Sequence, residues 1–164
     1  MRKVLIAVFV ANLILTAVAL AILPEQVAIH FGGGGKPDSW ASREFNAAIF
    51  LVLEVPFFLM FYFAHLLTRG STSRFINIPN KNYWLQKENL PLFNEKFGFY
   101  MAEFGVALFV FFFCITGLTI QANLSEPVRL NEALFLMIFV AYMVYVVWWL
   151  VRLVRGLRVP EATA

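Results

Sequence analysis

The chain has 164 residues and a formal net charge of +3; 61% of its residues are hydrophobic and 14% are charged. Soluble domains are typically about half apolar and about one quarter charged, so this composition excludes an ordinary soluble protein. Four apolar stretches, at residues 4–23, 45–67, 97–120 and 133–154, each reach the roughly 20 residues needed to cross a bilayer. We therefore predict an all-α, polytopic protein with four transmembrane helices in a single membrane domain, residues 1–164.

The first stretch allows two interpretations. Arg2 and Lys3 form a positively charged start, and Ala19–Ala21 match the small-x-small pattern that precedes signal-peptide cleavage, which would leave Ile22 as the mature N-terminus. The apolar run is longer than the usual signal-peptide core, however, and it ends only at Pro24, which lacks the N–H needed to continue a helix. We favour a first transmembrane helix over a cleaved signal.

The loop at 24–44 is rich in residues that shape turns and helix ends. Its four consecutive glycines, 32–35, adopt positive φ without steric cost and predict a sharp turn. Asp38, Ser39 or Ser42 can cap the second helix by accepting a hydrogen bond from a free backbone N–H. We therefore expect a short, turned segment that leads directly into the second helix.

Two further features of this loop bear on function. Trp40 is expected at the level of the lipid headgroups, where an amphipathic ring is stable. The Gly34-Gly35-Lys36 sequence does not form a phosphate-binding loop, because the Walker pattern requires glycine where His30 stands and serine or threonine where Pro37 stands. A nucleotide site is therefore not indicated.

Ionisable side chains inside the second and third stretches are the least expected feature of the sequence. Glu54 lies about nine residues into its stretch, roughly 14 Å deep and close to the bilayer midplane, and His65 follows on the same helix face. Glu103 is expected at a depth between them and can reach toward His65. A charge at mid-bilayer costs from about 2.5 to more than about 10 kcal/mol, so we expect these side chains to face inward and to be paired or protonated.

Two hypotheses for Glu54 stay open. As a structural contact, a neutral Glu54 would bond to Asn12 or to a backbone carbonyl freed by Pro56, while Asn12 and Thr16 supply hydrogen bonds between helices. As a functional group, Glu54 would handle protons or ions, or line a polar cavity.

No catalytic residue, metal site or cofactor is predicted. The His-Glu-x-x-His and Gly-x-Ser-x-Gly patterns of metalloproteases and serine hydrolases do not occur in the sequence. His30 and His65 are expected on opposite faces of the membrane and cannot share a metal. The single cysteine, Cys114, is expected to pack as a small hydrophobic residue in the third stretch.

The loop at 68–96 contains a polar segment with two large aromatic side chains. Pro79 restrains its backbone, and Tyr83 and Trp84 suit an anchor at the membrane interface. The segment is either a loop clamped beneath the helices or a partner-binding patch.

The third helix has a recognisable start and a face of small residues. Asn89 or Asn94 can cap it, and Pro91 is tolerated in its first turn. Close helix contact, within one chain or in a dimer, is offered by three small residues, Gly98, Ala102 and Gly105.

The loop at 24–44 resembles a family of bacterial membrane proteins, the domain of unknown function 1648. The family pattern is a first helix ending in Leu-Pro, then Ile-x-His-Phe or similar, Gly-x-x-Asp, an aromatic residue, and Ser-Lys. The matching positions here are Leu23, Pro24, His30, Phe31, Gly35, Asp38, Trp40 and Ser42. Ala28 stands where the family often has proline, and Arg43 keeps the charge of the usual lysine.

A second family segment, Asn-x-Pro-Asn-Lys-x-Tyr-Trp-Leu, is similar to part of the 68–96 loop. Its matching positions are Asn77, Pro79, Asn80, Lys81, Tyr83, Trp84 and Leu85. The best-known relatives are toxin-immunity proteins of the SdpI type, in which further membrane helices follow this domain. This sequence contains four apolar stretches, so the resemblance implies the domain and does not by itself imply immunity.

The distribution of basic residues predicts the orientation in the membrane. Short loops with an excess of lysine and arginine remain in the cytoplasm. Of the 13 lysines and arginines, all but Lys36, Arg43 and Arg129 lie near the two termini or in the 68–96 loop. We therefore expect both termini inside, and the loops at 24–44 and 121–132 outside, in a bacterial plasma (inner) membrane.

The sequence predicts a non-enzymatic binding, regulatory or immunity-like protein that engages another membrane protein or an envelope-active peptide through its outer loop. The alternative is a small transporter or proton-coupled permease that uses Glu54 and Glu103. The conspicuous outer loop favours the first, and the chain is short for the paired repeats of many transporters, although a homo-oligomer would offer a pathway. The positive net charge follows from the topology and indicates no nucleic-acid partner.

Overall fold

The computed structural model describes residues 1–66 and 77–159. Four of its helices are long and apolar enough to cross a membrane, which confirms the predicted fold class. In chain order the elements are α1 (Arg2–Ile22), β1 (Gln26–Phe31), the 3-10 turn η1 (Gly33–Gly35), β2 (Pro37–Ser42), α2 (Arg43–Tyr62), the 3-10 turn η2 (Ala64–Leu66), α3 (Lys81–Trp84), α4 (Leu90–Asn123) and α5 (Glu132–Gly156).

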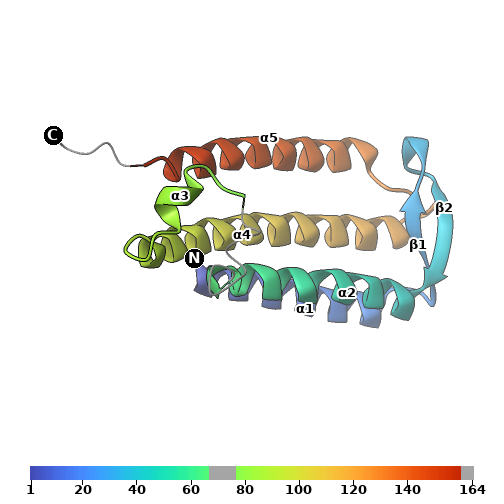
Figure 1. Cartoon of the computed structure of the whole chain (residues 1–164). Helices are drawn as coiled ribbons and strands as arrows, with labels where there is room; N and C mark the ends of the chain where they lie inside the picture. The colour runs from blue at the N-terminus through green and yellow to red at the C-terminus, as the bar shows by residue number, and fades with distance from the viewer. Residues whose placement is uncertain (67–76, 160–164) are drawn as a thin grey trace.

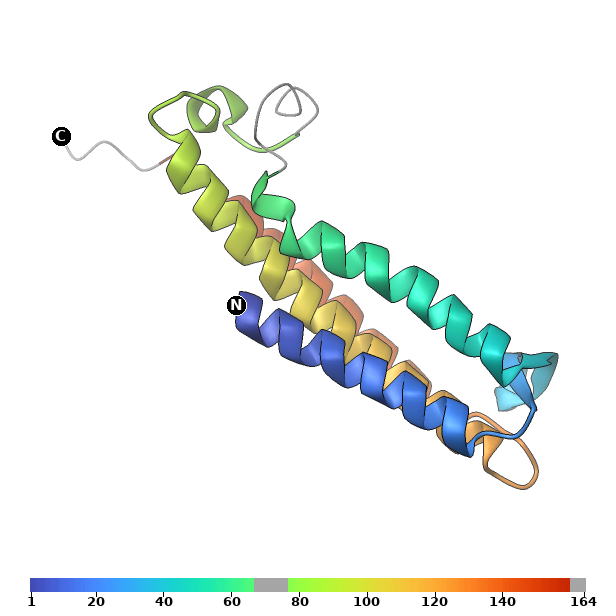
Figure 2. The ribbon, with the colours of Figure 1, turned by 90° about the horizontal axis from the view of Figure 1, so that it is seen from below.

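The four long helices form layers rather than a ring around one centre. In Figure 1, α1 and α2 lie on one side, α4 lies in the middle, and α5 packs on the far side of α4. Seen from below, α1 and α2 are nearest the viewer and α5 lies behind α4 (Figure 2). This arrangement refines the predicted four-helix bundle, because α1, α2 and α4 share the core and α5 flanks it.

Two helix boundaries differ from the predicted spans by more than three residues. The second span was expected to run to residue 67, but α2 ends at Tyr62, and the Leu66 N–H then bonds the Phe63 carbonyl in the tighter 3-10 turn η2 (2.8 Å). Ala64 is fully buried in this turn, so the apolar run continues although the α-helix does not. His65 therefore lies in η2, outside the helix on which it was expected.

The start of α4 also differs. The third span was expected from residue 97, but α4 begins at Leu90, with Pro91 in its first turn as predicted. Asn89 occupies the N-cap position, but its side chain makes no cap hydrogen bond. Its 34 residues measure roughly 50 Å. A bilayer core is roughly 30 Å thick, so part of α4 extends beyond the hydrocarbon.

Small residues and aromatic rings fill the core between α1, α2 and α4. A Cβ added at Gly105 would lie 2.9 Å from both Leu5 and Phe61, so the predicted close contact of helices occurs within one chain. Phe9 of α1 stacks on Phe58 of α2 with ring centroids 4.2 Å apart, and it meets Phe109 of α4 edge-on. These aromatic contacts form a continuous apolar layer at the middle of the three helices.

The segment between α1 and α2 forms an antiparallel β-hairpin, which the sequence analysis did not predict. Val27 pairs with Ala41 and Ala28 pairs with Trp40, and the register shifts near His30. The predicted glycine turn is confirmed, since the backbone at residues 34 and 35 has a φ of 71°. The hairpin lies at the end of the helices opposite the start of α1 (Figure 2).

Candidate functional site

The hairpin is fixed to the helices by one asparagine side chain. The backbone N–H of Ala28 donates to Oδ1 of Asn123 (2.7 Å), and Nδ2 of Asn123 donates to the Ala28 carbonyl (3.0 Å). Asn123, the last residue of α4, thus pairs with the free edge of β1 as a neighbouring strand would. Sequence reasoning missed this residue.

The turn of the hairpin is fixed by the loop between α4 and α5. The Leu130 N–H donates to the Gly35 carbonyl (2.9 Å), and Nε of Arg129 donates to the Gly34 carbonyl (2.8 Å). A Cβ added at Gly35 would overlap the backbone of Leu130. Gly35 is therefore required both for its positive φ and for this close approach.

The base of the hairpin is held by the start of α2. The backbone N–H of Arg43 donates to the Glu25 carbonyl (3.1 Å), and its guanidinium donates to the Leu23 carbonyl (3.0 Å). Ser42 caps α2 by accepting a hydrogen bond from the Phe45 N–H (3.1 Å), as predicted. Pro24 follows directly on the end of α1, also as expected.

Three motif side chains remain exposed on this fixed hairpin. Nδ1 of His30 lies 2.5 Å from Oδ1 of Asp38, and the two side chains are 70% and 51% exposed. In the tautomer that carries its proton on Nδ1, His30 donates to the Asp38 side chain and Nε2 is left for a partner. Asp38 therefore orients His30 rather than capping α2, and Trp40 is half exposed beside them in sequence.

An apolar groove of about 440 Å³ runs beside β1, between the hairpin and the hairpin ends of α4 and α5. Phe31 and Ile29 form its hairpin wall, and His30 and Glu132 are its ionisable lining residues. The remaining walls are formed by Gly32, Gly33, Gly35, Ile115, Leu118, Thr119, Leu130, Phe135 and Leu136. The groove and the exposed His30–Asp38 pair together form the candidate site.

The second family segment, from Asn77 to Leu85, lies at the opposite end, around a fully buried Trp84. Nε1 of Trp84 donates to the carbonyl of Leu157 just after α5 (2.7 Å), and the Asn80 side chain reaches the same carbonyl (3.3 Å). Tyr83 is partly buried, and its carbonyl accepts from the Asn89 side chain (3.0 Å). Of the two interpretations of this segment, these contacts favour the clamped loop.

The other members of that motif are less enclosed. Asn77 and Pro79 are exposed, and Lys81 begins the single turn of α3. The backbone of Asn80 is in the left-handed region, with a φ of 56°, which turns the chain into α3. Within residues 1–66 and 77–159, no contact of Asn77 or Pro79 points to a partner site.

The polar residues predicted within the membrane separate into two groups. Asn12 and Glu54 are buried between α1, α2 and α4. Asn12 donates to the carbonyls of Val8 (2.8 Å) and Phe109 (2.9 Å), which confirms that it bonds across helices. The carboxyl oxygens of Glu54 have no hydrogen-bond partner in the part of the chain that the structure describes, so the expected bond to Asn12 is not formed.

Glu103 has a different neighbour from the one expected. Its carboxylate pairs with the guanidinium of Arg152 on α5, which also lies over the ring of Trp148 (5.2 Å to its centroid). Glu103 lies 20 residues before the end of α4 at residue 123, and Arg152 lies 20 residues after the start of α5 at residue 132. The two residues therefore lie at equal depth. Their equal distance from the α4–α5 loop could have been read from the sequence, which was interpreted as pairing Glu103 with His65.

Comparison with known families assigns the first part of the chain. Residues 7–54 match one family model. It is the Domain of unknown function (DUF1648). The DUF1648 match covers most of α1, the whole hairpin, and α2 as far as Glu54, which confirms the predicted resemblance for these residues. The segment around Trp84 lies outside the match. No curated protein matches the chain, and no solved structure matches it.

Proposed function

We propose that this multi-pass membrane protein is a non-enzymatic recognition protein of the bacterial plasma membrane. Its DUF1648 hairpin would bind another membrane protein or an envelope-active peptide. The observation that carries the proposal is a hairpin fixed on every side by Asn123, Leu130 and Arg43, on which His30, Asp38 and Trp40 are nevertheless exposed. A rigid surface loses little conformational entropy on binding, which favours affinity.

The chemistry of the site suits a peptide with an apolar anchor residue. The groove walls are mainly apolar, so an inserted leucine or aromatic side chain would be removed from water or from headgroups. His30 lines the groove with its Nδ1 held by Asp38, and its other ring nitrogen can hydrogen-bond the peptide backbone. Trp40 adds a large exposed ring of the kind that often dominates binding energy.

The proposal requires the hairpin to face outward. The structure supports an even number of membrane crossings, so the start of α1 and the end of α5 lie on the same side of the membrane. The basic residues favour the cytoplasm for that side. Topology reporters fused after Ser73 and after Ala164 should both report cytoplasm, and one inserted after Gly34 should report the exterior. A cytoplasmic signal at Gly34 would remove the basis for outer recognition.

The experiment on recognition compares the partners captured by the wild-type protein with those captured by its variants. Wild-type protein and three single variants, His30→Ala, Asp38→Asn and Trp40→Ala, would be crosslinked in cells, purified in detergent, and analysed by quantitative mass spectrometry. We expect one protein or peptide to be enriched by the wild type and reduced at least tenfold in each variant. Melting temperatures should remain close to the wild-type value, because all three side chains are exposed.

Lys36→Ala provides a matched control, since Lys36 is also an exposed hairpin residue but lies outside the motif. It should retain the partner. If all five proteins capture the same set, the hairpin is not a recognition surface, and if the three motif variants lose stability together, the motif is structural.

The alternative, a permease that uses Glu54 and Glu103, has less support. Glu103 is paired with Arg152 between α4 and α5, whereas Glu54 is buried between α2 and its neighbours α1 and α4. The two carboxyl groups therefore occupy different helix interfaces and do not form one pathway within a single chain.

A further inference from the structure

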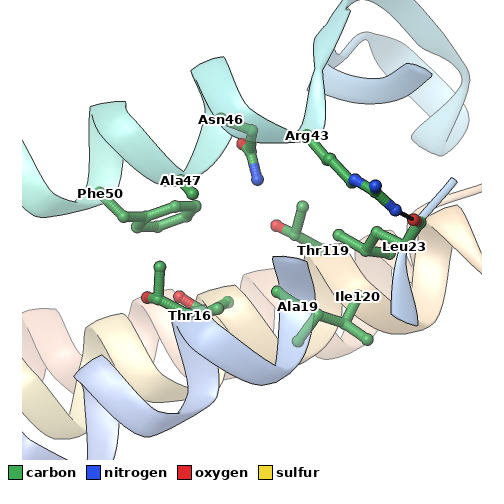
Figure 3. Close-up of a pocket in the computed structure, with 10 residues that line it drawn as sticks. Thr16, Ala19, Leu23, Arg43, Asn46, Ala47, Phe50, Thr119 and Ile120 are labelled. Carbon is green, nitrogen blue, oxygen red and sulfur yellow. Dashed lines mark hydrogen bonds between the residues drawn. The ribbon is translucent and has the colours of Figure 1, made fainter. Parts of the chain in front are cut away.

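Arginine side chains line cavities at both ends of the helices, but they are engaged differently at the two ends. At the hairpin end, Figure 3 shows the Arg43 guanidinium reaching the Leu23 carbonyl beside a cavity of about 10 Å³, which has room for about one water molecule. Arg129, at the same end, donates to the Gly34 carbonyl. Both guanidinium groups therefore serve the fold, because each one bonds a backbone carbonyl of the hairpin or of its base.

A larger cavity, of about 400 Å³, lies between α4 and α5 at the opposite end of these helices (Figure 1). Two arginines of α5, Arg152 and Arg155, line it, and its described lining residues include no carboxylate. Because the two arginines are three positions apart, they lie on the same face of α5 and can contact one ligand together. The other lining residues are Tyr100, Trp148, Val151 and Gly156.

The guanidinium of Arg152 is held in position by groups on α4 and α5. It donates to the carboxylate of Glu103, whose side chain is 14% exposed, whereas the Arg152 side chain is 37% exposed. Its Cζ also lies 5.2 Å from the ring centroid of Trp148 and 5.7 Å from that of Tyr100, within the range of cation–π attraction. A guanidinium has five N–H donors, so donors remain, in a fixed orientation, for a ligand in the cavity.

Arg155 adds a charge that is not balanced within the described residues. Its side chain is exposed and makes no ion pair with any described carboxylate, whereas Arg152 is balanced by Glu103. A Cβ added at Gly156 would overlap the Tyr100 hydroxyl, so that hydroxyl lies against the backbone of α5 beside the two arginines. An unbalanced positive charge surrounded by N–H and O–H donors suits an anion with several oxygen atoms, such as a phosphate.

The depth of the cavity indicates where this phosphate would come from. Arg152 lies 20 residues after the start of α5 at residue 132, which is roughly 30 Å along the helix. The hydrocarbon of a bilayer is also about 30 Å thick, so a membrane that begins at the hairpin ends of the helices has its other headgroup layer at this cavity. Arg2 gives the same level, because it lies 20 residues before the end of α1 at residue 22.

An apolar stripe on α5 leads from the membrane interior to the cavity. Val144, Val147 and Val151 are spaced by three and four residues, so they lie on one face of the helix. All three are exposed, and Val151 also lines the cavity. A phospholipid would place its phosphate beside the arginines and an acyl chain along these valines, whereas a free phosphate would leave the stripe unused.

We propose that this cavity binds the phosphate of an anionic phospholipid, such as phosphatidylglycerol, in the leaflet at the end of α5. Arginine binds phosphate oxygens through parallel N–H donors, and basic pockets between membrane helices hold acidic lipid headgroups in this way. Trp148 and Tyr100 lie at the headgroup level, where amphipathic rings are stable. The ammonium group of a zwitterionic lipid would add a positive charge beside Arg155, so an anionic headgroup is favoured.

The test measures the melting temperature of the purified, delipidated full chain in a nonionic detergent. Dioleoyl phosphatidylglycerol, dioleoyl phosphatidylcholine and inorganic phosphate are titrated in separate series at constant ionic strength. A ligand that binds only the folded protein raises the melting temperature as it fills the site. We expect a saturable rise with phosphatidylglycerol and little change with phosphatidylcholine, which has the same acyl chains, or with inorganic phosphate.

One variant and a matched control locate the effect. Arg155→Gln removes the unbalanced charge, and it should increase the phosphatidylglycerol concentration at half of the effect by about tenfold or more. Its melting temperature without lipid should stay close to the wild-type value, because Arg155 is exposed. Arg158→Gln is the control, since Arg158 is also exposed, three residues further on, and does not line the cavity. It should respond to phosphatidylglycerol as the wild type does.

Equal rises with the two phospholipids, or no rise with either, would overturn the proposal. An equal loss of the effect in Arg155→Gln and Arg158→Gln would show attraction to the total positive charge, without a site. A rise with inorganic phosphate as large as that with phosphatidylglycerol would assign the cavity to free phosphate and overturn the lipid assignment. None of these outcomes depends on a recognition partner at the hairpin, so the lipid site and the proposed function can fail separately.

Discussion

Replacement of Trp84 by alanine should lower the free energy of unfolding by about 3–5 kcal/mol, the usual cost of removing a fully buried large aromatic side chain. Trp84 is 0% exposed, packs with Phe93 and Leu157, and donates its indole N–H to the Leu157 carbonyl. The loss combines a cavity with removal of one of the two side-chain hydrogen bonds to the Leu157 carbonyl. Unfolding can be followed in detergent with a thiol-reactive dye, because the partly buried Cys114 becomes reactive when the helices separate.

Two controls separate packing from hydrogen bonding at this position. Trp84→Phe keeps much of the ring but loses the indole N–H, so we expect an intermediate loss of about 1–3 kcal/mol. Trp40→Ala makes the same chemical change at a tryptophan that is 50% exposed and should be nearly neutral for stability. Equal losses at Trp84 and Trp40 would contradict the view that Trp84 clamps the segment before α4 to the end of α5.

Replacement of Gly35 by alanine should also be strongly destabilising, by about 2–3 kcal/mol. The left-handed backbone at Gly35 costs an alanine about 1–2 kcal/mol. The added Cβ would in addition overlap the Leu130 backbone and displace the Leu130 N–H from the Gly35 carbonyl, at a cost of about 1 kcal/mol.

Gly33→Ala is the matched control two positions earlier. A Cβ at Gly33 meets no described atom within 4 Å, and its φ is not positive. We expect its stability to change by less than about 0.5 kcal/mol, as for ordinary surface substitutions. Both variants can be measured by the same thiol-reactivity melt. If Gly35→Ala has the same melting temperature as Gly33→Ala, the turn is not held by the α4–α5 loop.

The sequence was sufficient for those features that depend on long apolar runs or on neighbouring residues. The four helices follow from hydropathy, the cap at Ser42 from local hydrogen bonding, and the turn from consecutive glycines. The DUF1648 resemblance was visible because its motif residues lie close together in the chain.

The hairpin was missed although β1 carries larger apolar residues at every second position, Val27, Ile29 and Phe31. Its partner β2, Pro37–Ser42, lacks the two-residue alternation from which a strand is recognised, and the pairing is irregular near His30. The contacts that fix it come from Asn123 and Leu130, and in both cases one partner is a backbone group. Because any residue type can supply a backbone carbonyl, the identity of the residue does not reveal these contacts, and they cannot be predicted from one sequence.

The Glu103–Arg152 pair was predictable in principle. Antiparallel neighbours joined by a short loop place residues at equal distances from that loop at equal depth, and this rule selects Arg152 directly. The assignment to His65 assumed that α2 continued to residue 67, and the early end of α2 at Tyr62 moved His65 off that helix.

The bond between Ala28 and Asn123 joins residues that are 95 positions apart. Chains are synthesised at about 5–20 residues per second, so roughly 5 to 20 seconds separate the appearance of the two partners at the ribosome. During this interval the DUF1648 segment has no α4 against which to close, and the free edge of β1 is available to other chains. A newly made molecule therefore passes through a stage in which its hairpin is formed by local pairing alone, and the hairpin is fixed to the helices only after α4 has been synthesised.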